Sequence, residues 1–224
     1  MRPFTPFSPL SRLAQMVLLA VIVQLGPPLG AFGAQAAPVK ILALGDSLTA
    51  GYGLPAGEGF VPQLEKALRA QGIDARVLDG GVSGDTTAGG LARLDWALAE
   101  DPQVVIVELG ANDALRGLDP GQAKSNLDAI LAKLTAQHRA VLLAGMLAPR
   151  NLGADYVDAF DAIYPDLARH YGITLYPFFL KGVAADPALN QADGLHPTAA
   201  GVAIIVRGIL PALRQVIAKA GAPS

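Results

Sequence analysis

Short apolar runs alternate with amphipathic stretches along the chain from residue 39 onward. Each run is four to seven residues long and rich in Val, Ile, Leu or Ala, which is typical of a buried strand. The run VVIVEL is nearly continuous and β-branched, as expected for a central strand of a parallel sheet. The predicted strands are Val39–Leu44, Ala75–Leu78, Val104–Leu109, Ala140–Met146 and Ile173–Phe178.

The stretches between these runs carry apolar residues three and four positions apart, and this spacing predicts helices. In the second stretch we expect Leu91, Leu94, Leu98 and Trp96 to contribute buried surface. The predicted helices are Phe60–Gln71, Thr86–Glu100, Gly121–Gln137, Asp155–Tyr171 with an interruption near Pro165, and Thr198–Lys219 with a bend at Pro211.

Alternation of strands and helices with short connections predicts one α/β domain, a parallel sheet covered by helices on both faces. Ligands bind such sheets beyond the carboxyl ends of the strands. Three polar segments follow the first three strands, and a fourth lies between the fifth strand and the last helix, so all four are expected on one rim. They are Gly45-Asp46-Ser47-Leu48, Gly81-Val82-Ser83-Gly84-Asp85, Gly110-Ala111-Asn112-Asp113 and Asp193-Gly194-Leu195-His196-Pro197.

The first 36 residues differ in kind from the rest of the chain. Arg2 and Arg12 precede a largely apolar stretch, Leu13–Leu25, and Ala34-Gln35-Ala36 forms a small-x-small cleavage pattern. This is the arrangement of a secretory signal peptide. The apolar stretch has 13 residues, whereas a helix that crosses a bilayer needs about 20. We therefore predict an export signal over residues 1–36 and a periplasmic or secreted protein, with a retained membrane anchor as the alternative.

Charge and cysteine content narrow the class of protein further. Cleavage leaves 188 residues, 37–224, enough for one good core. Only Arg2 and Arg12 of the 17 basic residues are removed, so 15 Lys and Arg face 19 Asp and Glu, a net charge of −4. Without a clustered basic excess, nucleic acid is not an expected partner. The absence of cysteine excludes a lipid-anchored lipoprotein and a disulfide framework.

The fourth polar segment supplies a base for the serine of the first. Ser47 follows the first strand closely, where a turn can hold its hydroxyl at the mouth of the sheet. Asp193 lies three residues before His196, a spacing that lets the carboxylate hold one imidazole nitrogen while the other takes the Ser47 proton. Neither segment is decisive alone, because Asp46 or Ser47 is also a typical helix cap and Pro197 a typical helix start.

The second and third segments carry groups that could stabilise the oxyanion of acyl transfer. The N–H of Gly84 can approach closely because glycine has no side chain. Asn112 can donate from its amide, and the N–H of Ser47 is a third donor. Turn chemistry is the simpler explanation of Gly84 or Asn112 taken alone. We expect no metal site, because no second His or Cys accompanies His196.

Together the four segments resemble the sequence blocks of the SGNH hydrolases, also called GDSL esterases and lipases, which are centred on Ser, Gly, Asn and His. The match extends over residues 45–53, 82–87, 110–113 and 193–197 and covers nearly all of the mature chain. It is closest to the bacterial periplasmic branch of multifunctional thioesterase, protease and lysophospholipase enzymes and related arylesterases. The resemblance implies a three-layer α/β/α flavodoxin-like fold with a five-stranded parallel sheet, an SGNH-type hydrolase domain over 37–224, and no metal or organic cofactor.

The resemblance also implies roles for individual residues. Ser47, His196 and Asp193 would form a catalytic triad, and the N–H of Ser47, the N–H of Gly84 and the side chain of Asn112 would form the oxyanion hole. Two loops, 114–120 and 147–156, would shape the acyl pocket. The apolar residues that we expect to line the substrate site are Leu115, Leu118, Met146 and Leu147.

We therefore predict a monomeric serine hydrolase that cleaves carboxylic esters and thioesters, with acyl esters, lysophospholipids or aryl esters as substrates and no stable membrane insertion after signal cleavage. Export makes cytosolic acyl-CoA a poor physiological candidate. A carbohydrate O-acetyl esterase with the same triad is the alternative, and a shallow polar pocket would favour it. A non-catalytic binding module would be expected to have lost the Ser47–His196 pair, which is intact.

Overall fold

Five parallel strands form one sheet in the order β2-β1-β3-β4-β5. The sheet is seen in a computed structural model of the chain, which describes residues 1, 3 and 37–221. The predicted export signal, residues 1–36, lies outside the described residues except for Met1 and Pro3. The predicted α/β fold with a parallel sheet is confirmed. The strands are β1 (Val39–Gly45), β2 (Ala75–Gly81), β3 (Val104–Glu108), β4 (Ala140–Ala144) and β5 (Thr174–Tyr176).

The two strands β1 and β3 lie in the interior of the sheet, next to each other. All residues from Ile41 to Gly45 in β1, and all of β3, are buried. A strand covered on both faces must be apolar along its whole length, which explains the continuous Val, Ile and Leu runs. The exception is Glu108, the last residue of β3, whose side chain is fully buried at the carboxyl edge.

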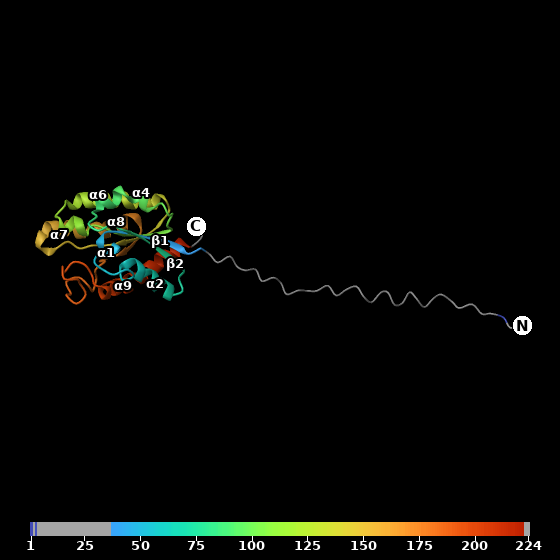
Figure 1. The fold of residues 1–224 in the computed structure, drawn as a ribbon. Coiled ribbons are helices and arrows are strands. Elements are labelled where there is room, and N and C mark those ends of the chain that lie inside the picture. Colours follow the sequence, from blue (N-terminus) through green and yellow to red (C-terminus); the bar gives the residue numbers. More distant parts are fainter. Residues whose placement is uncertain (2, 4–36, 222–224) are drawn as a thin grey trace. The chain divides into compact units, whose positions relative to one another are not determined.

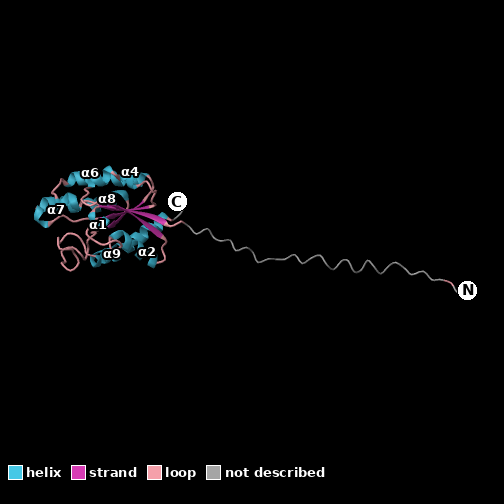
Figure 2. Cartoon of the chain, in the orientation of Figure 1, coloured by secondary structure: helices cyan, strands magenta, loops and turns pink. Residues whose placement is uncertain are grey.

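Helices cover the sheet as two layers, with α2 and α9 on one face and α4, α6 and α8 on the other (Figure 1). Figure 2 shows the strands enclosed between these layers. In α2 the buried residues Phe60, Leu64 and Leu68 recur at helical spacing, so one side of the helix packs inward. The helices are α1 (Ser47–Ala50), α2 (Phe60–Ala70), α3 (Thr87–Ala92), α4 (Leu94–Ala97), α5 (Ala111–Leu115), α6 (Pro120–Ala136), the 3-10 helix η1 (Arg150–Leu152), α7 (Ala154–Asp161), α8 (Ile163–Tyr171) and α9 (Ala199–Ala220).

The helix α9 is long and apolar enough, by length and composition alone, to cross a membrane. It packs against α2 and the strands β3, β4 and β5, and 44% of its most apolar stretch is buried inside the protein. Its apolar residues are therefore those of a core helix. Pro211 lies within α9, and the helix continues past it as one element.

Two of the predicted helices are interrupted. The predicted break near Pro165 is confirmed, since α7 and α8 meet at Ala162. Proline lacks an N–H and its ring clashes with the carbonyl four residues earlier, so it favours a kink or break in a helix, and here the break falls just before α8, which contains Pro165. The break inside Thr86–Glu100 was not predicted. There α3 and α4 meet at Arg93, where the backbone leaves helical geometry at φ −101° and ψ 6°.

The prediction that Trp96 is buried is wrong, because its side chain is 74% exposed. The inward positions are taken by Leu94 and Ala97 of the short helix α4 and by Leu98, which follows it. Residues three and four apart share a face of a helix, whereas a residue two positions on points elsewhere. Trp96 therefore lies on the solvent side of this segment.

Candidate active site

The four predicted segments meet at the carboxyl edge of the sheet. Ser47 begins α1 directly after β1, Gly84 lies in the loop after β2, and Asn112 lies in α5 after β3. His196 comes from the loop before α9, and its Nε2 lies 2.9 Å from Ser47 Oγ. Asn112 Nδ2 donates to the carbonyl of Asp85, in the loop after β2, at 2.9 Å. The structure thus brings together residues that the sequence predicted to share one rim.

Ser47, His196 and Asp193 form a continuous chain of hydrogen bonds. Asp193 Oδ2 lies 2.6 Å from His196 Nδ1, and His196 Nε2 lies 2.9 Å from Ser47 Oγ. An ionised carboxylate can only accept, so we assign the imidazole hydrogen to Nδ1, which leaves Nε2 to accept from the Ser47 hydroxyl. This is the arrangement that can activate a serine for attack on a carbonyl.

Asp193 is held in its ionised form by the groups around it. Its Oδ1 accepts hydrogen bonds from the backbone N–H groups of Leu195, at 2.9 Å, and His196, at 3.0 Å. The backbone N–H of His196, then its ring, then the N–H of Leu195 lower the pKa of Asp193 to about 2. The carboxylate is therefore charged at neutral pH and can support an imidazolium at His196.

Two residues to which the sequence analysis gave no role hold the histidine loop in place. The ring of Tyr52 packs on the ring of His196, with centroids 4.6 Å apart. Gln191 Nε2 donates to the carbonyls of Tyr52, at 2.8 Å, and Pro197, at 3.0 Å. The loop that carries the base is thereby tied to the loop that follows the serine. The contacts of Tyr52 with His196 and Gln191 join segments far apart in the chain, so no local sequence signal indicated them.

The turn that presents Ser47 rests on two buried carboxyl groups. Asp46 caps α1, with its Oδ1 accepting from the N–H of Leu48 at 3.0 Å. Glu108 Oε2 lies 2.7 Å from Thr49 Oγ1 and 3.3 Å from the backbone nitrogen of Asp46. Glu108 therefore anchors α1 to the end of β3. In the sequence it is only an acidic residue at the end of an apolar run, and that position did not indicate this role.

Burial raises the pKa of both carboxyl groups. The pKa of Asp46 rises to about 6, because desolvation outweighs the hydrogen bonds from Leu48 and Asn112. Burial also raises the pKa of Glu108 well above its usual value, and the negative charge of Asp46 adds to this effect. Glu108 Oε1 has no hydrogen-bond partner among the described residues. The neutral acid is therefore the form of Glu108 that this site favours.

Two of the three predicted oxyanion donors are free to bind a substrate. Within residues 37–221, nothing accepts a hydrogen bond from the backbone N–H of Ser47 or of Gly84. Gly84 has a φ of 85°, a backbone conformation that glycine adopts without strain. Arg116 Nη2 donates to the Gly84 carbonyl at 2.7 Å, which holds the next peptide group, between Gly84 and Asp85.

The third predicted donor, the Asn112 amide, already has two acceptors. Its Nδ2 lies 3.0 Å from Asp46 Oδ2 and 2.9 Å from the carbonyl of Asp85. With both hydrogens engaged, Asn112 can reach an oxyanion only by sharing one of them. In the structure the Asn112 side chain joins the turn before Ser47 to the loop that contains Gly84.

A second set of buried polar groups holds α5, and with it Asn112. Asp113 accepts from the hydroxyl of Thr87 at 2.6 Å and from its backbone N–H at 2.8 Å. Asn126 Nδ2, in α6, donates to the same hydroxyl at 3.0 Å. These bonds satisfy buried polar atoms and connect α5 to α3 and α6, so the Asn112 segment has a fixed orientation.

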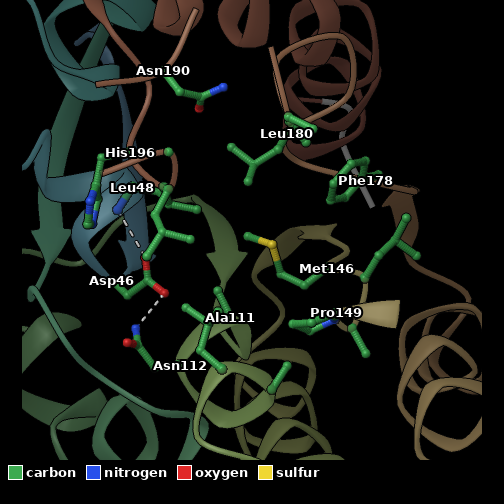
Figure 3. A pocket seen from close by; sticks show the side chains of 18 of the residues that line it. Asp46, Leu48, Ala111, Asn112, Met146, Pro149, Phe178, Leu180, Asn190 and His196 are labelled. Atoms are coloured by element: carbon green, nitrogen blue, oxygen red, sulfur yellow. Dashed lines mark hydrogen bonds between the residues drawn. The ribbon is translucent and has the colours of Figure 1, made fainter. Parts of the chain in front are cut away.

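A cavity of about 580 Å³ opens beside Ser47 and His196 (Figure 3). Its volume lies in the range typical of small-molecule sites. The segments after β3, β4 and β5 supply most of its walls, which are largely apolar. Residues from these segments that line it include Ala111, Ala114, Met146, Pro149, Phe178 and Leu180.

Three of the four residues predicted to contact substrate line this cavity, namely Leu115, Met146 and Leu147. Met146 is buried, whereas Leu115 and Leu147 are exposed at the surface. Leu118 does not line the cavity, contrary to the prediction. Its carbonyl accepts from the hydroxyl of Tyr156 at 2.8 Å, so its segment is tied to α7 instead.

A parallel α/β sheet that carries a hydrogen-bonded serine, histidine and aspartate at its carboxyl edge, beside an apolar cavity, has the features of a serine hydrolase. Comparison with known families agrees with this class. Residues 43–204 match the GDSL-like Lipase/Acylhydrolase family, and the chain belongs to that family.

Individual relatives have names of ester hydrolases. Esterase TesA of Pseudomonas aeruginosa is 42% identical over 184 residues, which cover 82% of this chain and 92% of that protein. Thioesterase 1/protease 1/lysophospholipase L1 of Escherichia coli strain K12 is 40% identical over 163 residues, 72% of this chain and 77% of that protein. The solved structure of AlinE4, an SGNH-hydrolase family esterase, has 49% identity and a TM-score of 0.69, and covers 84% of this chain and 100% of its own. The predicted family and the predicted class of enzyme, an ester hydrolase, are confirmed.

Proposed function

We propose that the chain hydrolyses carboxylic esters and thioesters of acyl chains through an acyl-enzyme formed on Ser47. The observation that supports this most strongly is the hydrogen-bonded chain from Ser47 through His196 to Asp193, with distances of 2.9 and 2.6 Å. The names of the relatives, which include esterase, thioesterase and lysophospholipase, support the same class of substrate.

In the first half of the reaction Ser47 Oγ attacks the carbonyl carbon while His196 Nε2 takes the hydroxyl proton. The carbonyl oxygen becomes an oxyanion, which the N–H groups of Ser47 and Gly84 stabilise. Asn112 adds a shared hydrogen bond from its amide. Asp193 stabilises the imidazolium formed at His196.

The tetrahedral species then collapses: the bond from the carbonyl carbon to the leaving oxygen or sulfur breaks, the imidazolium gives its proton to the leaving alcohol or thiol, and the acyl group stays bound to Ser47 Oγ, which completes the first half. His196 then removes a proton from water, and the hydroxide attacks the acyl carbonyl. The second tetrahedral species collapses to the free acid, and His196 returns the proton to Ser47. Every bond and proton of the hydrolysis is accounted for by the ester, water and these side chains, so the reaction needs no external oxidant, reductant or metal.

The cavity favours an acyl chain over an acetyl group. A volume of about 580 Å³ with largely apolar walls can bury an alkyl chain. A carbohydrate O-acetyl esterase would be better served by a shallow polar site. Long or medium acyl esters, lysophospholipids among them, are therefore the substrates that we propose.

The proposed setting is the periplasm or the cell exterior, which rests on the signal-peptide pattern of residues 1–36. The mature chain would act without stable membrane insertion, because the apolar residues of α9 contribute to the core. We expect a monomer whose partners are its small-molecule or lipid ester substrates. The mature net charge of −4 gives no support for a nucleic-acid partner.

The proposal is tested with mature protein and p-nitrophenyl esters that range from acetyl to palmitoyl, beside Ser47→Ala and the matched control Ser125→Ala. Ser125 is exposed on α6 and does not line the cavity. We expect a rate maximum at medium or long acyl chains, a loss of roughly 10⁴-fold or more in kcat for Ser47→Ala, and unchanged rates for Ser125→Ala. Circular dichroism checks that both variants remain folded.

Retention of more than about a tenth of the wild-type rate in folded Ser47→Ala would rule out Ser47 as the nucleophile. Activity confined to acetyl esters would favour the sugar deacetylase instead. Esters and thioesters of one acyl chain, assayed side by side, show whether both bonds are cleaved.

A further inference from the structure

Asn190 is a polar side chain that lines the cavity next to apolar wall residues. It lines the cavity together with Met146, Phe178 and Leu180, and only 6% of its surface is exposed. It belongs neither to the Ser47–His196–Asp193 chain nor to the oxyanion donors. A buried polar group in an apolar binding site usually either satisfies a local need of the fold or selects a polar group of the ligand.

The amide nitrogen of Asn190 has a local partner for each of its hydrogens. Nδ2 donates to the carbonyl of Val183 at 2.7 Å and to the carbonyl of Asp186 at 2.8 Å. These bonds also decide which way the amide points. If it were flipped, Oδ1 would face two carbonyl oxygens, none of which can donate. The oxygen is therefore fixed on the opposite side.

The amide oxygen of Asn190 is left as an unused acceptor. Within residues 37–221, no group donates a hydrogen bond to Oδ1, although both nitrogen donors are paired. Figure 3 shows this oxygen turned toward the space bounded by His196, Leu48 and Leu180. The cavity thus contains a rigid hydrogen-bond acceptor that the catalytic reaction does not use.

An alkyl chain in this cavity would displace solvent from Oδ1 and leave a buried acceptor without a donor, which is unfavourable. A chain with a hydroxyl group at the right carbon would restore the hydrogen bond. Sites built to bond a substrate hydroxyl discriminate against the analogue that lacks it, because the polar group of the site is then left unpaired.

From this geometry we propose that the cavity selects esters and thioesters whose acyl chain carries a hydroxyl group, which donates to Asn190 Oδ1. The inference rests on the proposed function and specifies its substrate class. The largely apolar walls assign the cavity to the acyl chain, not to the leaving alcohol. The chemistry at the scissile bond is unchanged, since only binding of the chain involves Asn190.

The test compares p-nitrophenyl esters of one medium-length acyl chain, either plain or with a hydroxyl moved one carbon at a time from the carbonyl to the terminal carbon. For each ester, kcat/KM is measured with wild type, Asn190→Leu and the control Met146→Leu. A hydroxyl near the carbonyl changes the intrinsic reactivity of the ester. The quantity compared between proteins is therefore the kcat/KM of the hydroxylated ester divided by the kcat/KM of the plain ester. Damage to the fold lowers both rates of a variant and cancels in this ratio.

At one hydroxyl position or a few adjacent ones we expect the wild-type ratio to exceed that of Asn190→Leu by about tenfold, as for one neutral hydrogen bond. Met146→Leu should keep the wild-type ratio, because it changes an apolar wall without touching the acceptor. A second measurement needs no variant: the inhibition constants of a free hydroxylated fatty acid and of the plain fatty acid are compared on the wild type. We expect the hydroxylated acid to bind more tightly by a similar factor.

The proposal is overturned if the ratio is the same in wild type and Asn190→Leu at every hydroxyl position. A preference confined to hydroxyl groups on the leaving alcohol would overturn the assignment to the acyl chain. Either result is distinguishable from failure of the proposed function, since plain esters would still be hydrolysed in a Ser47-dependent way. Where Asn190→Leu is too unstable to assay, equal inhibition by the two fatty acids decides against the proposal.

Discussion

The surroundings of three carboxyl groups near Ser47 shift their pKa values in different directions. Asp193, partly exposed and bonded by N–H donors, has its pKa lowered to about 2. Asp46, buried beside the serine, has its pKa raised to about 6, and burial raises that of Glu108 well above its usual value. The same functional group thus serves as a charged support for His196 in one place and as a buried acceptor for α1 in another.

Glu108 is a positioning residue for Ser47, because it accepts hydrogen bonds from Thr49 and from the backbone of Asp46 in the turn that carries the serine. Glu108→Gln keeps an oxygen acceptor and resembles the neutral acid, so we expect kcat within about threefold of wild type and little loss of stability. Glu108→Leu leaves the Thr49 hydroxyl and the Asp46 N–H unpaired and should lower the free energy of unfolding by about 1–3 kcal/mol. Urea denaturation and kcat on a medium-chain ester measure the two effects.

We expect the Leu variant to lose more of its kcat than of its substrate affinity, because Ser47 shifts while the cavity walls stay. If Glu108→Gln behaves as poorly as Glu108→Leu, a charged carboxylate is required, and the neutral form of Glu108 is contradicted.

At the scale of elements, the position of Ser47 depends on how closely α1 packs on β2. A Cβ atom on Gly81, the last residue of β2, would lie 2.3 Å from the backbone nitrogen of Ala50. Such a contact cannot be relieved by rotating a side chain, because the main chain fixes the position of a Cβ atom and its partner is a main-chain nitrogen. Gly81 is thus needed for close approach of two elements, although its backbone has an ordinary negative φ.

Gly81→Ala should therefore push α1 away from the sheet and displace Ser47 from His196. We expect a loss of about 1–3 kcal/mol in the free energy of unfolding and a fall in kcat of about 100-fold, typical of misplaced reacting groups. The matched control is Gly121→Ala in the first turn of α6, where the nearest atom to an added Cβ is Asp119 Oδ1 at 3.4 Å. Thermal melts and ester hydrolysis of both variants give the comparison, and equal behaviour would contradict the packing argument.

At the scale of the whole molecule, the shifted carboxyl groups affect stability at acid pH with opposite signs. A raised pKa, as at Asp46, means that the folded protein binds more protons than the unfolded chain between pH 3.8 and about 6, so this group's contribution falls as pH rises through that window. A lowered pKa, as at Asp193, stabilises the fold above pH 3.8, and this contribution is lost as pH falls toward about 2.

Asp193→Asn should accordingly be less stable than wild type at neutral pH, with a difference that shrinks as pH falls from 3.8 toward about 2. Because this aspartate is partly exposed, the direction of the change is the prediction. Urea titrations of both proteins over that pH range measure it, and a difference that is constant with pH would contradict the assigned cause of the pKa shift.

The sequence predicted most of the elements because hydrophobic spacing reports burial directly. All five strands were anticipated, with shifts at their ends, since most are short runs that must be apolar to lie between two helical layers, whereas the edge strand β2 also carries exposed Arg76 and Asp79. The break at Arg93, the short helices α1 and α5, and the exposure of Trp96 were missed. Elements of four to six residues contain too few positions for a spacing to be recognised.

What the sequence alone determined was the order of strands and helices and the four polar segments at strand ends, because periodicity and turn residues are local properties. These fixed the α/β class, the shared rim and the family resemblance. Only the tertiary structure decided which polar atoms meet: Ser47 lies 149 positions from His196 in the chain, yet their side chains are hydrogen-bonded. Likewise, the fully buried Glu108, the fixed acceptor of Asn190 and the place of Leu118 outside the cavity follow from packing between segments distant in the chain, which no local pattern records.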